Sequence, residues 1–134
     1  MTLTLEHAKS LAEAALGRAR SRGMNVSVAV IDASFLLKAG LRDDGAGPVT
    51  LDIAFGKARA ALAFGCTSRQ IADALAGNPL AGPSVLAAVP GPVVLLPGGL
   101  LVKDTSSAII GAQQFSMRTS RSCGSVGESE LQQL

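Results

Sequence analysis

Two patterns of hydrophobic and polar positions open the chain, one helical and one extended. Between residues 5 and 22 apolar side chains recur at spacings of three and four, which predicts an amphipathic helix. Thr4 is suited to cap its start, and Gly23 to end it. Apolar and polar residues then alternate over 26–31, which predicts a strand. A second strand over 35–41 follows a short turn, so the two are expected to pair as an antiparallel hairpin.

The middle of the chain combines a strong helical pattern with a proline-rich one. An alanine-rich stripe predicts a helix capped by Thr50 and running to Phe64, and a shorter helix is predicted over 68–75. Four of the six prolines fall between residues 77 and 92, so this segment is predicted to be irregular. Further strands are predicted over 93–96, 100–103 and 107–112.

This order of elements predicts an α+β domain, with an antiparallel sheet of about five strands flanked by helices. The domain is expected to span residues 1–112. From Gln113 onward neither a strand nor a helix period is kept, and serine, glycine and glutamine are frequent. We therefore expect residues 113–134 to be a divergent tail that is disordered or ordered only at an oligomer interface.

Composition changes this picture mainly by suggesting self-association. Hydrophobic residues make up 48% of the chain and charged residues 16%, with a mean hydropathy of +0.37. A monomer of this composition exposes apolar patches, so we expect a homo-oligomer. The net charge is only +2 and there is no Trp or Tyr, which argues against nucleic-acid binding.

The first residues of the chain and its cysteines indicate where in the cell the protein is expected to be. The chain does not open with a signal-peptide pattern, and no apolar run is long enough to span a bilayer. Cys66 and Cys123 form no CxxC motif and are expected to be free thiols. These features favour the cytoplasm and argue against a membrane partner.

Several ordered segments resemble one known family. They are the opening helix, the strand "VSVAVID", the loop that begins Arg42-Asp43-Asp44-Gly45, the helix "LDIAFGKARAALAFG" and the Pro97-Gly98-Gly99 turn followed by "AIIGA". Together they are similar, over residues 2–112, to the GlcG/HbpS-like (DUF336) family. The resemblance implies a profilin-like sheet, a homo-oligomer, and haem or a related tetrapyrrole as ligand. Two features depart from the family pattern. Arg59 stands where the family usually has a small or β-branched residue, and the segment after Ala112 lacks the family's later glycines and acidic pair.

The only histidine, His7, is the candidate axial ligand for haem iron or for another metal. It lies at the border of the first helix's apolar stripe, so a half-exposed structural histidine is the competing interpretation. His7, Cys66 and Cys123 do not have the spacing of zinc ligands.

The loop after the second strand offers two candidates. Arg42 could hold a carboxylate or a haem propionate through two parallel hydrogen bonds, or could belong to a solvated turn. Asp44 could act as a general base if burial raised its pKa, or could hold the backbone amides before Gly45. Asp43 is predicted to be part of a solvated turn.

The second helix and the glycine turn offer the other candidates. Lys57 could bind an anionic ligand, or move a proton with a lowered pKa, or form an ion pair with Asp52 or Asp32. The backbone N–H groups of Gly98 and Gly99 could face an anion, or the glycines could simply form a hairpin turn.

Three functions remain open at this stage. The first is an oligomeric small-ligand-binding accessory protein, with haem or a related tetrapyrrole as the ligand implied by the family. The second is an enzyme of the isomerase, hydratase or lyase type acting on a small organic acid or carbonyl compound, with Arg42 holding the substrate and Asp44 or Lys57 moving a proton. The third is a structural subunit without a ligand.

Overall fold

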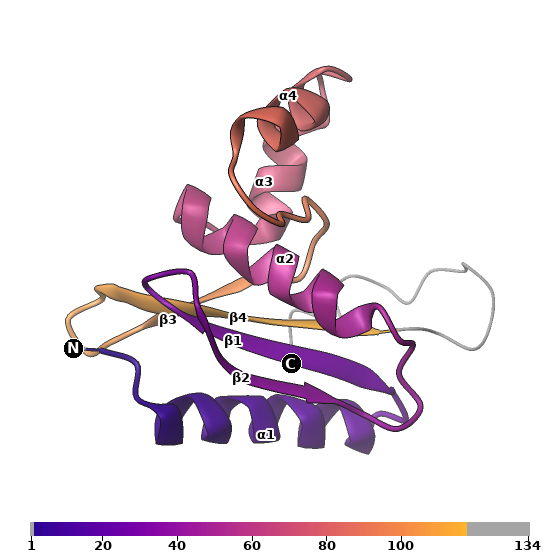
Figure 1. Cartoon of the computed structure of the whole chain (residues 1–134), viewed down its shortest axis with the longest axis vertical. Coiled ribbons are helices and arrows are strands. Elements are labelled where there is room, and N and C mark those ends of the chain that lie inside the picture. The colour runs from indigo at the N-terminus through magenta and orange to yellow at the C-terminus, as the bar shows by residue number, and fades with distance from the viewer. Residues whose placement is uncertain (1, 118–134) are drawn as a thin grey trace.

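The computed structural model describes residues 2–117, which fold around a four-stranded antiparallel sheet with the strand order β2-β1-β4-β3. Helix α1 covers one face of the sheet and α2 covers the other (Figure 1). The predicted α+β class is confirmed, with four strands in place of about five. In chain order the elements are α1 (Leu5–Ser21), β1 (Val26–Asp32), β2 (Leu37–Arg42), α2 (Thr50–Phe64), α3 (Ser68–Leu75), α4 (Ala81–Ala88), β3 (Leu100–Lys103) and β4 (Ile109–Met117).

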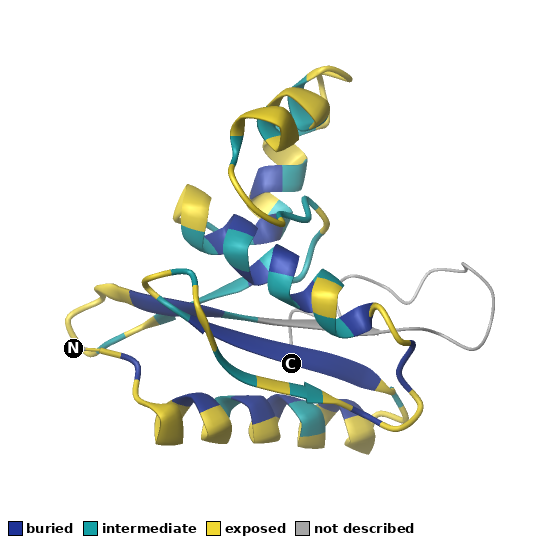
Figure 2. Ribbon diagram, viewed as in Figure 1, coloured by how far each residue is buried: buried dark blue, intermediate teal, exposed yellow. Residues whose placement is uncertain are grey.

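The core forms around β1, which lies between β2 and β4 and is buried from Val26 to Ile31 (Figure 2). Its alternate valines pack on the buried alanines of α1, and Ile31 packs on Ala58 and Ala61 of α2. Side chains of successive residues point to opposite faces of a strand, so this one strand supplies both halves of the core. The alanines let both helices lie close to the sheet.

The ends of the helices follow local chemistry. The Thr4 side chain caps α1 by accepting a hydrogen bond from the backbone N–H of His7, as predicted. Gly65 ends α2 in the left-handed conformation. The prediction that Thr50 caps α2 is wrong, because Thr50 is the first helical residue and Val49 holds the cap position without a side-chain bond. The Thr50 hydroxyl instead donates to the carbonyl of Gly47 and accepts from the buried Ser27 hydroxyl.

The proline-rich region differs from its prediction in two ways. Residues 81–88 form α4, because Pro83 lies in the first helical turn, where its missing N–H has no helical acceptor to lose. The strand predicted over 93–96 is absent from the described chain. Val94 there donates its backbone N–H to the Gly56 carbonyl of α2, and its side chain lies where a Cβ of Gly56 would be. This segment therefore packs on a helix and adds no fifth strand.

The last strand extends past the predicted domain boundary. β4 continues to Met117 and pairs with β1 from Val26↔Met117 to Asp32↔Gly111. The boundary predicted at residue 112 thus falls inside a central strand, and residues 113–117 are not a tail. Residues 118–134, for which we predicted a disordered or interface-ordered tail, lie outside the described residues.

Arg59 joins α2 to two other segments. Its guanidinium donates hydrogen bonds to the carbonyls of Phe35, Pro90 and Pro92, and it stacks over the rings of Phe35 and Phe55. Beyond this attachment α3 and α4 stand away from the sheet (Figure 1). Among the described helices, none is both long and apolar enough to cross a membrane.

Candidate functional site

Lys57 lies on α2 beside the alanines that pack on the sheet, and it is half-buried. Burial lowers the pKa of its ammonium group, because the charged form loses hydration there. The predicted ion pair is not formed: Asp52 is exposed, and the Asp32 carboxylate accepts from the backbone N–H groups of the following turn. Within residues 2–117 no carboxylate compensates the charge of Lys57. The side chain is thus available to an anion.

Gly99 lies directly against the backbone of Lys57. A Cβ at Gly99 would come within 2.8 Å of the Lys57 carbonyl oxygen, so only glycine fits there. The Gly99 N–H donates to the Ser68 hydroxyl, and the Ser68 N–H donates to the Gly99 carbonyl at 3.1 Å. The N–H of Gly99, a candidate for anion binding, is therefore already bonded to Ser68. Gly98 precedes it with φ of 123°, and the turn connects to β3 without forming a hairpin.

The loop after β2 is tied together by its charged side chains. Arg42 donates from Nη1 to the Ala46 carbonyl at 2.9 Å. Asp43 is only 7% exposed and accepts two parallel hydrogen bonds from Arg20 of α1, at 2.9 and 3.0 Å. The Arg20 guanidinium holds the pKa of the Asp43 carboxyl below its usual range. The prediction of a solvated turn at Asp43 is therefore wrong, since the sequence does not show that the last turn of α1 and this loop meet.

Asp44 does not meet the condition set for a general base. Its side chain is exposed, and the backbone N–H of Asp44 donates to the Asp43 carboxylate at 2.9 Å. The predicted role of holding amides in this loop thus belongs to Asp43. The burial on which the role of general base depended is therefore absent at Asp44.

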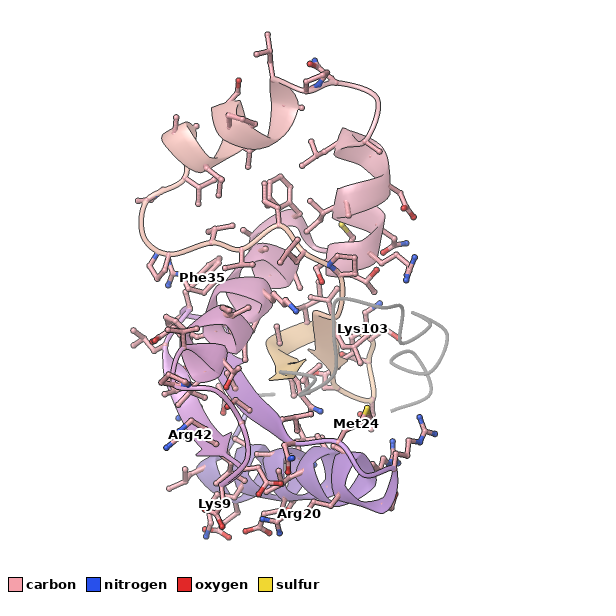
Figure 3. The ribbon with its side chains drawn as sticks, turned by 90° about the vertical axis from the view of Figure 1, so that its right-hand side faces the viewer. Lys9, Arg20, Met24, Phe35, Arg42 and Lys103 are labelled. Atoms are coloured by element: carbon pink, nitrogen blue, oxygen red, sulfur yellow. The ribbon has the colours of Figure 1, made fainter. Side chains whose placement is uncertain are left out.

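The candidates form two separate groups. Lys57 and Gly99 are adjacent, whereas the Arg42 loop precedes the first turn of α2, roughly 10 Å along the helix axis from Lys57. Figure 3 shows Arg42 on the α1 side of the molecule, with Phe35 towards α2. The three-part binding surface expected from the sequence is therefore only partly assembled within the described chain.

His7 lies apart from both groups. It is exposed near the start of α1, on the opposite side of the sheet from α2 and Lys57 (Figure 1). In the described residues no group of three or more His, Cys, Asp or Glu side chains could hold a metal ion. His7 and Lys57 of one protomer therefore do not converge on a single ligand.

Two hollows are lined by described residues. The larger, of about 300 Å³, lies between α3 and α4, and the other, of about 180 Å³, lies among the N-terminal segment, the β1–β2 turn and the start of β4. Lys57, Arg42 and Gly99 line neither of them. Pockets of small-molecule sites usually span about 300–1,000 Å³, so the smaller hollow is below that range.

Comparison with known families supports what the fold suggests. Residues 3–121 match the family model described as haem degrading protein HbpS-like. The chain belongs to the HbpS-like family. The resemblance seen in the sequence is thereby confirmed, and the match extends past residue 112 through the end of β4.

Several solved structures share the fold. The crystal structure of HbpS is 32% identical, with a TM-score of 0.75, over 87% of this chain and 78% of that one. A PduOC–haem complex is 25% identical, with a TM-score of 0.77, over 99% and 91% of the two chains. The Klebsiella pneumoniae protein ORFY, of the DUF336 family, is 27% identical, with a TM-score of 0.78, over 89% and 81%. No curated protein matches this HbpS-like chain.

Proposed function

We propose that this protein is an oligomeric accessory protein that binds haem or a related tetrapyrrole through its carboxylates at the Lys57 side of α2. The observation that carries the proposal is the half-buried ammonium of Lys57 without a carboxylate partner in residues 2–117. A bound carboxylate would restore the favourable interactions that the ammonium loses on burial. The likeness to PduOC, whose structure is a haem complex, supports a tetrapyrrole as the source of that carboxylate.

The described residues fit the propionates of haem better than its iron. Lys57 supplies a cation, but the one histidine is on the other side of the sheet. An axial His7 would therefore have to come from another protomer, or the ring would be held at Lys57 without it. We accordingly assign recognition at this site to the carboxylates and derive no chemistry at the iron.

Titration with three porphyrins tests this assignment. Haem, metal-free protoporphyrin IX and the dimethyl ester of haem, with both carboxylates blocked, would each be followed by absorbance at micromolar protein. We expect the first two to bind with similar affinity and the ester to bind at least tenfold more weakly. A flat haem titration, or equal binding of haem and its ester, would contradict the proposal.

Substitutions at three positions test where the site lies. Lys57→Gln removes the ammonium and is expected to weaken haem and protoporphyrin IX alike, by about ten- to 150-fold, the range of one hydrogen bond to a charged group. Lys9→Gln is the matched control, because Lys9 is an exposed lysine of α1, paired with Glu6 at 3.6 Å, on the other side of the sheet. His7→Ala should leave binding of protoporphyrin IX unchanged. Equal losses in the Lys57 and Lys9 variants would place the ligand elsewhere.

One observation favours the enzyme alternative. A lysine whose pKa is lowered by burial is a better proton acceptor near neutral pH than an exposed one. Arg42 and Asp44, however, lie in a separate group, so Lys57 alone would carry the chemistry. Turnover of small 2-oxo acids or 2-hydroxy acids that is lost in Lys57→Gln and kept in Lys9→Gln would favour this function.

Self-association and a cytoplasmic location complete the proposal. Exposed leucines support the first, and Cys66, a free thiol in the described chain, is in keeping with the second.

A further inference from the structure

Both register shifts of the described sheet lie at the end that carries the β1–β2 and β3–β4 turns (Figure 1). Lys38 of β2 has no partner on β1, because the register shifts by one residue there. Ile110 of β4 has no partner on β3 for the same reason. An extra residue of this kind is a β-bulge, which redirects a side chain and is frequent beside functional sites.

The two bulges turn their extra residues towards the α1 face of the sheet. Ala39 packs in the core cluster between the sheet and α1, so in a regular strand its neighbour Lys38 would face α2. Ala112 packs with α2, and regular alternation would place Ile110 on that same face. Instead, Lys38 lines a hollow together with Leu3 and Ile110, which both belong to the cluster on the α1 side. The two bulges therefore meet at one hollow.

This hollow is lined by two opposite charges, and no ion pair joins them. The Asp32 carboxylate accepts through Oδ1 from the backbone N–H groups of Ser34 and Leu36, at 2.8 and 3.2 Å. Its Oδ2 accepts no hydrogen bond from residues 2–117, and Lys38 forms no ion pair with any of these residues. One carboxylate oxygen and one ammonium group are thus available to a ligand that brings the opposite charges.

The size and the remaining lining of the hollow restrict that ligand. The volume of about 180 Å³ is small. It corresponds to roughly six water molecules of about 30 Å³ each, which suits a molecule of a few carbon atoms and excludes a tetrapyrrole. Of the other residues around the hollow, four are apolar: Leu3, Ala33, Ile109 and Ile110. A short alkyl group would be favourably buried against them.

We propose that this hollow binds a small aliphatic α-amino acid, with its ammonium at Asp32 and its carboxylate at Lys38. Such a zwitterion supplies each of the two protein charges with its opposite, and its side chain faces the apolar lining. The hollow is on the α1 face of the sheet, whereas Lys57 is on α2, which covers the other face. This inference therefore goes beyond the proposed function and does not depend on haem.

Titration of the isotope-labelled full chain with three small molecules, followed by its amide NMR signals, tests the proposal. Alanine carries both charges, lactate has a hydroxyl in place of the ammonium, and alaninamide lacks the carboxylate. The amides of Ser34 and Leu36 report on the site, because they donate to the Asp32 carboxylate. We expect alanine to shift both signals at millimolar concentration, and each analogue to bind about tenfold more weakly or worse. No shift with alanine, or an analogue that binds as tightly as alanine, would overturn the proposal.

Substitutions assign each charge of the ligand to its residue. Lys38→Gln should abolish the preference for alanine over alaninamide and keep the preference over lactate. Asp32→Asn should have the reverse effect, and its amide oxygen can still accept from the backbone of the turn. Lys9→Gln is the matched control, since this exposed lysine of α1 is not part of the hollow, and all three affinities should stay unchanged. Both preferences kept in Lys38→Gln, or both kept in Asp32→Asn, would overturn the assignment.

Haem titration separates this site from the one proposed at Lys57. Lys38→Gln should leave haem binding unchanged, and Lys57→Gln should leave alanine binding unchanged. Circular dichroism would verify that the variants are folded. Alanine binding that falls in Lys57→Gln, or haem binding that falls in Lys38→Gln, would overturn a separate amino-acid site. A flat haem titration with alanine binding intact would overturn only the function proposed for Lys57.

Discussion

The body of the molecule differs in burial from its arm, residues 68–96, which contain α3, α4 and the chain returning towards β3. In the body, β1 is completely covered from Val26 to Ile31 by two helices and two neighbouring strands. In the arm, α4 is as apolar as a core helix and has no buried residue within the described structure. The body is therefore explained by contacts within one chain. The apolar surface of α4 has no such cover among the described residues.

The largest expected effect comes from adding one methyl group to a glycine in each region. A Cβ at Gly111 of β4 would lie 2.3 Å from the Ile31 carbonyl oxygen, whereas at Gly77 of the arm it would meet nothing within 4 Å. Gly111→Ala should cost more than about 3 kcal/mol, since a sheet backbone cannot move aside easily, and Gly77→Ala should change stability by under about 0.5 kcal/mol. Urea unfolding followed by circular dichroism measures both. Similar effects at the two sites would contradict the comparison.

The next effect concerns the connection between the two regions. Arg59→Ala removes three hydrogen bonds to the carbonyls of Phe35, Pro90 and Pro92, together with two ring contacts. We expect a loss of about 1–2 kcal/mol, because the guanidinium is partly exposed. Limited proteolysis should cut near residue 91 faster than in the wild type, with β1 still intact. Unchanged cleavage there would show that Arg59 does not hold the arm.

These two regions also differ in how far the sequence predicted them. The periodicity of α1 comes from its contact with one face of the sheet. The alternation in β1 separates the valines that face α1 from Ser27 and Ile31 on the α2 face. Both patterns are therefore visible locally, and α3 was predicted with its observed bounds. The prolines of the arm led to a prediction of irregular structure where α4 forms. A proline is tolerated in the first turn of a helix and not in its interior, and composition alone does not show which position it occupies. The stretch 93–96 has strand composition but packs at Gly56, a long-range contact that sequence spacing does not reveal.

The candidate site shows the same limit. Lys57 was identified from its place beside the alanine stripe, which is a local pattern. Asp43 was misjudged because its partner Arg20 lies on another element, and the role of Ser68 at Gly99 depends on two segments that meet only in the fold. Charged and polar pairs that join distant segments leave no periodic signal.

Within the body, the Arg20–Asp43 pair predicts a dependence on acid pH. The pKa of Asp43 is lowered from its ordinary value of 3.8, so the pair contributes stability above that pH, and the contribution is lost as pH falls through the folded-state pKa. Asp43→Asn should lower the Tm by a few degrees at pH 7. The difference from the wild type should shrink below pH 3.8. A difference that stays constant into acid would contradict the pair's role.

The smallest expected effect has the opposite sign. Lys57→Met replaces a half-buried ammonium that has no carboxylate partner in residues 2–117, and should stabilise the ligand-free protein at pH 7 by about 0.5–1 kcal/mol. The pKa of Lys57 is lowered from 10.5, so the wild type regains stability as pH rises from the folded-state pKa towards 10.5. The gain should therefore fade at high pH. A destabilised variant would mean that Lys57 has a structural role.

Hydrogen exchange of the wild type tests most directly the claim that the body is complete and the arm is not. Amides of β1 are expected to exchange slowly, because the strand is covered on both faces and lies between two other strands. Amides of α4 are expected to exchange markedly faster, because no residue of α4 is buried within the described structure. Equal protection of β1 and α4 would contradict this division of the molecule.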